Sequence, residues 1–123
     1  MSRPVGAHFH VAHGWSNAVL LPEVTRYSIP GAVRRYATVA RTVGAATVKD
    51  SDESAARALV VYLEQLNRDL DVGRLRDAAK VDEATFEFKL PVMAQAALAS
   101  GSPQNNPVVP TAEEIIGLYR RAW

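Results

Sequence analysis

The chain has 123 residues, 48% of them hydrophobic, which suits one compact domain with a real core. Fourteen basic residues nearly balance 13 acidic ones, so a nucleic-acid partner is not expected. There is no cysteine, which excludes disulfides and thiolate metal sites, and no apolar run is long enough for a membrane span or a signal peptide. We therefore expect a cytoplasmic protein without a membrane partner.

Residues 1–50 contain both weak and strong sequence indications of secondary structure. Residues 1–14 hold all three histidines and follow neither a helical nor a strand period, so we predict an irregular segment. From Ser16 to Tyr27 the sequence is helix-like, and Pro22 is expected to kink this helix or to start a fresh turn. A second helix is predicted from Pro30 to Gly44, followed by a loop over 45–50.

The longest predicted helix follows Ser51, a residue suited to cap its N-terminus. Leucines recur along it at spacings of four, three and four residues, which predicts one face packed against the core. These leucines are Leu59, Leu63, Leu66 and Leu70.

The last third of the chain predicts a short helical turn over 74–81 and a helix capped by Asp82, with a break or bend at Pro91. Residues 100–110, rich in Ser, Gly, Asn and Pro, predict a loop that either connects helices or closes over a substrate. Thr111 and Glu114 have the spacing of a capping box before a final helix. With no alternating run of strand length, the fold class is all-α: one domain over 1–123, irregular at 1–14 and with about five to six helices.

The three histidines His8, His10 and His13 are the only cluster of potential metal ligands in the sequence. Neutral imidazoles suit zinc, iron or copper. The spacing matches no common structural zinc motif and no acidic residue lies nearby. The residues alone therefore favour a hydrogen-bonded structural role for these histidines over metal binding.

Short motifs along the whole chain keep one order and spacing. Near the start stand Pro4-Val-Gly, then His13-Gly14, Asn17-Ala18 and Leu20-Leu21-Pro22. Further along follow Arg35-Tyr36-Ala37, Ala94-x-x-Ala97-Leu98, Asn106-Pro107, Pro110-Thr111 and Tyr119-Arg-Arg-Ala122-Trp123. In these motifs the chain resembles, from end to end, the C-terminal helical domain of iron-containing (group III) alcohol dehydrogenases, which have a dehydroquinate synthase-like fold.

The resemblance implies a metal position at His13. In that family a nucleotide-binding α/β domain precedes the helical domain, and one Asp and three His hold a divalent metal, iron or sometimes zinc, between the two. The last of these ligands corresponds to His13, and the other three lie upstream of this chain; His8 and His10 are not ligand positions. The family reaction is hydride transfer between NAD(P) and an alcohol or aldehyde, with the metal polarising the oxygen.

Three departures from the family pattern limit what the chain can do. Arg3 stands where the family has a cleft histidine near the substrate, and arginine cannot exchange a proton near neutral pH, so no catalytic residue is predicted. Ala12 replaces the proline before the metal histidine, and Val108 replaces a frequent arginine. The sequence contains no Gly-x-Gly turn for cofactor phosphates, so no cofactor-binding residue is predicted either.

The chain is therefore predicted to be the metal-binding helical domain of an NAD(P)-dependent alcohol dehydrogenase, in a truncated form. We do not expect this form to be active alone or to bind the metal or NAD(P) tightly. Two alternatives stay open. One is a subunit of a split oxidoreductase that works with a separate nucleotide-binding chain. The other is a non-catalytic homodimer that buries the interdomain face.

We assign Trp15 and Trp123 to packing, and Asn17 to helix capping rather than to orienting the metal loop.

Overall fold

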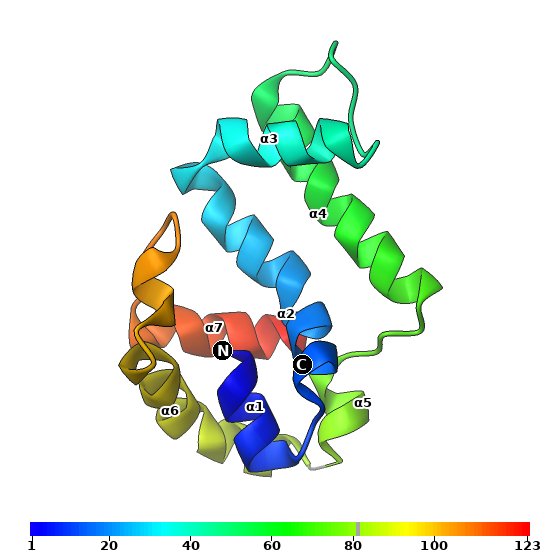
Figure 1. Ribbon diagram of the computed structural model, residues 1–123. Coiled ribbons are helices and arrows are strands. Elements are labelled where there is room, and N and C mark those ends of the chain that lie inside the picture. The colour runs from blue at the N-terminus through cyan, green and yellow to red at the C-terminus, as the bar shows by residue number, and fades with distance from the viewer. Residues whose placement is uncertain (81) are drawn as a thin grey trace.

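The computed structural model describes residues 1–80 and 82–123, and every regular element in them is helical (Figure 1). The all-α prediction is confirmed, although the described residues form seven α-helices rather than five or six. None of these helices is long and apolar enough to cross a membrane. The elements are α1 (Ser2–Phe9), α2 (His13–Ser28), η1 (Ile29–Gly31), α3 (Val33–Thr42), α4 (Asp52–Asp69), α5 (Leu75–Ala79), α6 (Glu83–Ala99), η2 (Ser102–Asn105) and α7 (Ala112–Ala122), where η marks a 3₁₀ turn.

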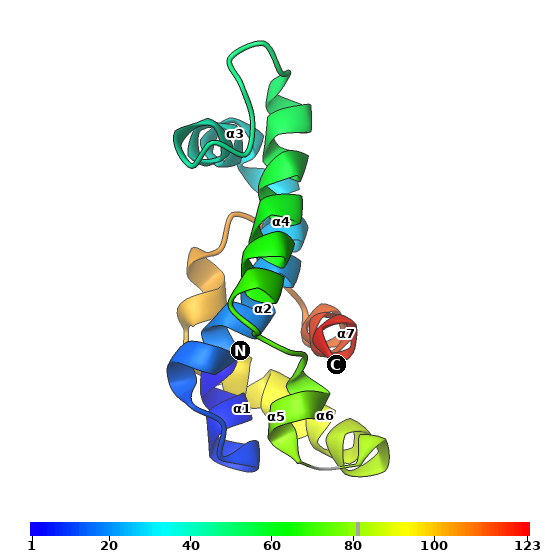
Figure 2. The ribbon, with the colours of Figure 1, turned by 90° about the vertical axis from the view of Figure 1, so that its right-hand side faces the viewer.

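Two long helices, α2 and α4, run along the molecule, and the remaining helices gather at its two ends (Figures 1 and 2). At one end α3 crosses the first half of α4, and the buried contact consists of three alanines and one leucine: Ala37, Ala40, Ala55 and Leu59. At the other end α1, α5, α6 and α7 surround the start of α2 and form the larger hydrophobic cluster.

Aromatic side chains fill the larger cluster. Phe86 is 1% exposed, stacks on Trp123 with ring centroids 4.0 Å apart, and lies 6.0 Å from the ring of Phe9. The buried Tyr119 hydroxyl donates a 2.7 Å hydrogen bond to the carbonyl oxygen of Met1, and burial raises the pKa of Tyr119. Trp15 is partly buried against the same cluster, so the assignment of both tryptophans to packing is confirmed.

The prediction of an irregular segment over residues 1–14 is wrong. Residues 2–9 form α1, His10 turns the chain in a left-handed conformation (φ 55°), and α2 already begins at His13. The His10 N–H bonds back to the Gly6 carbonyl at 3.0 Å and closes α1. Only Pro4, Val5 and Phe9 of this helix are buried, which is too few apolar positions to reveal a helical period in the sequence.

Two of the prolines lie within helices. Pro22 lies inside α2 and Pro91 inside α6, and neither breaks its helix. Each proline removes one backbone hydrogen bond, but packing of the helix on both sides of that turn keeps it helical. Pro30 lies in η1 instead of starting a helix, and α3 begins at Val33. Gly44, with φ 80°, follows the end of α3 as predicted.

The predicted N-terminal caps are confirmed. Ser51 accepts the Ser54 N–H at 3.2 Å, and Asp82 accepts the Thr85 N–H at 2.6 Å, which lowers the pKa of that carboxyl. A capping box also begins α7: the Thr111 hydroxyl accepts the Glu114 N–H at 3.2 Å, while the Glu114 carboxylate accepts the Thr111 N–H at 2.8 Å. The helical turn predicted over 74–81 is α5, except that residue 81 lies outside the described residues.

The leucine face of α4 is buried only in part. Leu59 is 4% exposed, whereas Leu66 is 38% and Leu70 is 65% exposed, so the core prediction is wrong for the last two. The reason is length: α3 has ten residues and α4 has 18, so α3 covers only the first half of α4. With Tyr62, which is 38% exposed, Leu66 and Leu70 form an uncovered apolar stripe on the second half of α4.

Candidate functional site

The site begins at the N-terminus of α2, where His13 is the first helical residue and is exposed to solvent. Ala12 is the N-cap, and its carbonyl oxygen accepts the buried Ser16 hydroxyl at 3.0 Å, which anchors this turn. His8 is half-buried in α1, and His10 is exposed in the turn that follows. Within residues 1–80 and 82–123, no three His, Asp or Glu side chains come together to hold a metal.

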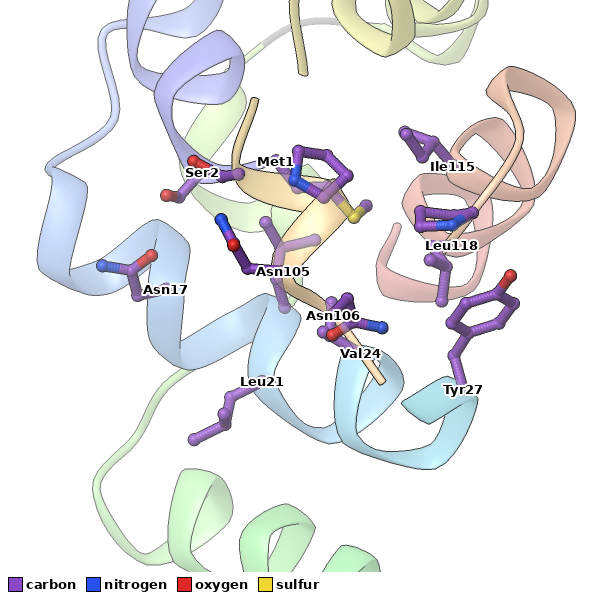
Figure 3. A pocket seen from close by; sticks show the side chains of 14 residues that line it. Met1, Ser2, Asn17, Leu21, Val24, Tyr27, Asn105, Asn106, Ile115 and Leu118 are labelled. Atoms are coloured by element: carbon purple, nitrogen blue, oxygen red, sulfur yellow. The ribbon is translucent and has the colours of Figure 1, made fainter. Parts of the chain in front are cut away.

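A pocket of about 420 Å³ lies along α2, beyond His13 (Figure 3). One wall is α2, and the facing wall is the segment that follows α6. Figure 3 shows Ser2, Asn17 and Asn105 at one end of the pocket, with Tyr27, Ile115 and Leu118 at the other. The lining residues are Met1, Ser2, Asn17, Leu20, Leu21, Val24, Tyr27, Ser102, Pro103, Asn105, Asn106, Pro110, Ile115 and Leu118.

Asn17 connects the metal position to the pocket. It lies four residues after His13 in the same helix, so the two side chains share a face of α2. The prediction that Asn17 caps a helix is wrong, because α2 begins at His13 and leaves Asn17 inside its second turn. The amide of Asn17 is exposed and lines the pocket instead.

The pocket lining carries no acidic or basic side chain. Its polar groups are the amides of Asn17, Asn105 and Asn106 and the hydroxyls of serine and tyrosine. The Tyr27 hydroxyl oxygen is buried, and among the described residues it has no hydrogen-bond partner in good geometry. Burial and the nearby Glu114 carboxylate raise the pKa of Tyr27. Tyr27 is therefore neutral at physiological pH, and the pocket suits a small uncharged molecule with hydroxyl or carbonyl groups.

Two other positions singled out from the sequence, Arg3 and Val108, lie outside the pocket lining. Arg3 is exposed on α1 and is not part of the pocket lining. Val108 does not line the pocket either, but its carbonyl oxygen accepts the Asn106 amide at 2.7 Å. Sequence reasoning did not find Leu20, Val24 or Tyr27 as pocket residues, because their apolar spacing in α2 is that of any core-facing helix.

Comparison with known proteins fixes the family. The C-terminal model of the Fe-containing alcohol dehydrogenase family matches residues 1–123. This chain belongs to that family. Lactaldehyde reductase of Escherichia coli K12 is 37% identical over 124 residues, covering 100% of this chain and 31% of that protein. The 1-propanol dehydrogenase PduQ of Salmonella typhimurium is 34% identical over 117 residues, covering 94% of this chain and 32% of that protein.

The fold agrees with the family assignment. The crystal structure of a 1,3-propanediol oxidoreductase superposes with a TM-score of 0.89 at 30% sequence identity, over 99% of this chain and 31% of that one. The match is to the C-terminal helical part of an iron-type alcohol dehydrogenase, as the motifs predicted. The chain thus spans about a third of the length of its relatives.

Iron-type alcohol dehydrogenases use a divalent metal and NAD(P). The family motif predicts one metal ligand in this chain, His13, and the described residues contain no group of three or more His, Asp or Glu that could hold the ion.

Proposed function

We propose that this chain is the C-terminal helical part of an iron-type alcohol dehydrogenase and has no dehydrogenase activity by itself. In this proposal His13 supplies one metal ligand, and the pocket along α2 forms part of the cleft for the alcohol or aldehyde. The observation that carries it is that Asn17, four residues after His13 on the same face of α2, lines a pocket without charged side chains.

The pocket supports a short neutral substrate. Apolar side chains from α2 and α7 surround a few amides and hydroxyls, so an alcohol or aldehyde with a few carbon atoms would find both apolar contacts and hydrogen-bond partners. The relatives named for lactaldehyde, 1-propanol and 1,3-propanediol fall in this class. The metal would polarise the substrate oxygen in a complete site, and the residues of this chain would bind and orient the carbon chain.

We expect the isolated chain to show no oxidation of NADH or NADPH with lactaldehyde or propanal when Fe²⁺, Zn²⁺ or Mn²⁺ is added. One imidazole cannot hold a catalytic metal, and the sequence lacks a phosphate-binding turn. Cofactor absorbance measured against a protein-free control tests this. A metal-dependent rate above that control, lost in His13→Ala, would show that the chain is an enzyme by itself.

A split enzyme is a second form of the same proposal. In it, a separately made nucleotide-binding domain supplies the Asp, two His and the cofactor site. Mixing this chain with the N-terminal part of a relative is the direct assay, and Arg3→His is the informative variant because Arg3 cannot transfer a proton. Activity with Arg3→His but not with Arg3 would assign the defect to this one position.

The uncovered stripe of Tyr62, Leu66 and Leu70 supports a second candidate function, a homodimer. We expect Leu66→Lys together with Leu70→Lys to lower the average mass in light scattering across a concentration series. Val48→Lys is the matched control, because Val48 is 89% exposed and lies in a loop away from the stripe. A monomeric mass for the unmodified chain at all concentrations would contradict this candidate.

A further inference from the structure

The wall of the pocket that follows α6 comes from a segment with little regular structure. Residues 100–110 contain one 3₁₀ turn, η2, and contribute Ser102, Pro103 and Asn105 to the lining. A segment of this kind holds a fixed position only where specific contacts tie it to a helix. The position of this wall therefore depends on where it is attached to α2.

Ser28 and Asn106 make that attachment across 78 positions of sequence. The Asn106 Nδ2 group donates to the Ser28 hydroxyl oxygen at 2.9 Å and to the Val108 carbonyl oxygen at 2.7 Å. The Ser28 hydroxyl donates in turn to the Val24 carbonyl oxygen at 2.6 Å, and Asn106 Oδ1 lies 3.0 Å from Ser28 Oγ. Ser28 is 0% exposed, so water does not compete for these hydrogen bonds.

A second contact lies beside the first. A Cβ atom at Gly31 would stand 2.4 Å from the Pro107 carbonyl oxygen, so the backbone of η1 touches the backbone of the segment directly. Asn106 and Pro107 are consecutive, and Ser28 and Gly31 are three residues apart. The two contacts together fix both the position and the direction of the wall.

The attachment also lies next to the polar groups of the pocket. Tyr27, which lines the pocket, precedes Ser28, and Asn106 itself lines the pocket beside Asn105. We propose that Asn106 is a positioning residue: its amide sets the distance between the α2 wall and the wall formed by 102–110, and so decides which ligand fits. This inference rests on the proposed function only in taking the pocket as the alcohol-binding part of the cleft.

Asparagine is suited to this role because one amide must donate twice. Aspartate at 106 would place a carboxylate beside the Val108 carbonyl oxygen and could donate to neither partner. Leucine fills a similar volume but makes none of these hydrogen bonds. In contrast, Ser28→Ala removes the link to α2 and keeps the Asn106 to Val108 hydrogen bond within the segment.

Hydrogen exchange of the isolated chain tests the attachment. In Asn106→Leu we expect the amides of 102–110 to exchange at least about fivefold faster, with the exchange of α3 and α4 unchanged, because a buried hydrogen-bonded link is lost. Gln104→Ala, at an exposed position of η2 outside the pocket lining, is the control and should exchange like the unmodified chain. If Asn106→Leu does not fold, Ser28→Ala takes its place, and unchanged exchange of 102–110 in the folded variant overturns the proposal.

Titration with 1-propanol, followed by the backbone NMR signals of Tyr27 and Asn105, adds a readout that a loss of stability alone would not change. We expect saturable shifts in the unmodified chain and at least about fivefold weaker binding in Ser28→Ala, which removes the link without changing a lining residue, at a temperature where both are folded. Equal binding in both chains, with unchanged exchange, overturns the proposal. If the unmodified chain shows no saturable shift, the pocket is not the alcohol site, and the exchange experiment still decides the role of Asn106.

Discussion

Replacing Phe86 by alanine is expected to lower the free energy of unfolding by about 3–5 kcal/mol, the usual cost of deleting a buried aromatic ring. Phe86 is 1% exposed, and its ring stacks on Trp123 and faces Phe9, so its loss leaves a cavity among residues from α1, α6 and the C-terminus. Since domains of this size are stable by about 5–15 kcal/mol, the variant would lose a large part of its stability. Urea unfolding followed by circular dichroism measures this change.

Phe88→Ala is the matched control, because it removes the same ring from the same helix two residues later. Phe88 is 80% exposed, so its removal should change the free energy of unfolding by no more than about 0.5 kcal/mol. Equal effects of the two substitutions would mean that α6 does not present the Phe86 side to the core.

Gly31→Ala is expected to destabilise the protein by about 1–3 kcal/mol or more, because it inserts an atom where there is no space. The new Cβ would lie 2.4 Å from the oxygen and 2.6 Å from the carbon of the Pro107 carbonyl group. Both are backbone atoms, so a side-chain rotation cannot relieve the clash, and η1 or the 102–110 segment must move. Thermal unfolding would report the loss of stability.

Gly14→Ala is the contrasting variant. Gly14 lies in the first turn of α2, and a Cβ there meets nothing within 4 Å. Alanine is the better helix former, so this change should be neutral or stabilise by up to about 1 kcal/mol. Similar losses from both alanine substitutions would show that the cost at Gly31 does not come from contact with Pro107.

Much of the fold could be predicted because its signals are local. The caps at Ser51, Asp82 and Thr111 each need a side chain and an N–H within a few residues, and all three form as expected. The errors arise where the outcome depends on distant packing. Residues 2–9 form a helix that the sequence did not predict, and Leu66 and Leu70 are uncovered because α3 is too short to reach them.

The site was predictable only at the position carried by a family motif. The helix was predicted from Ser16, but α2 begins at His13. This boundary decides whether the Asn17 amide caps a helix or faces a pocket, so the role of Asn17 was missed. Tyr27 and Asn105 are 78 residues apart and meet at the pocket only after folding. No period or spacing in the sequence relates them.

Because α3 and α4 meet mainly through alanines, the two ends of the molecule differ in how much apolar surface each side chain buries. Small side chains such as Ala37, Ala40 and Ala55 bury little apolar surface each, whereas the opposite end packs phenylalanine, tyrosine and tryptophan together. Opening of the α3–α4 end therefore costs less free energy than disruption of the aromatic end.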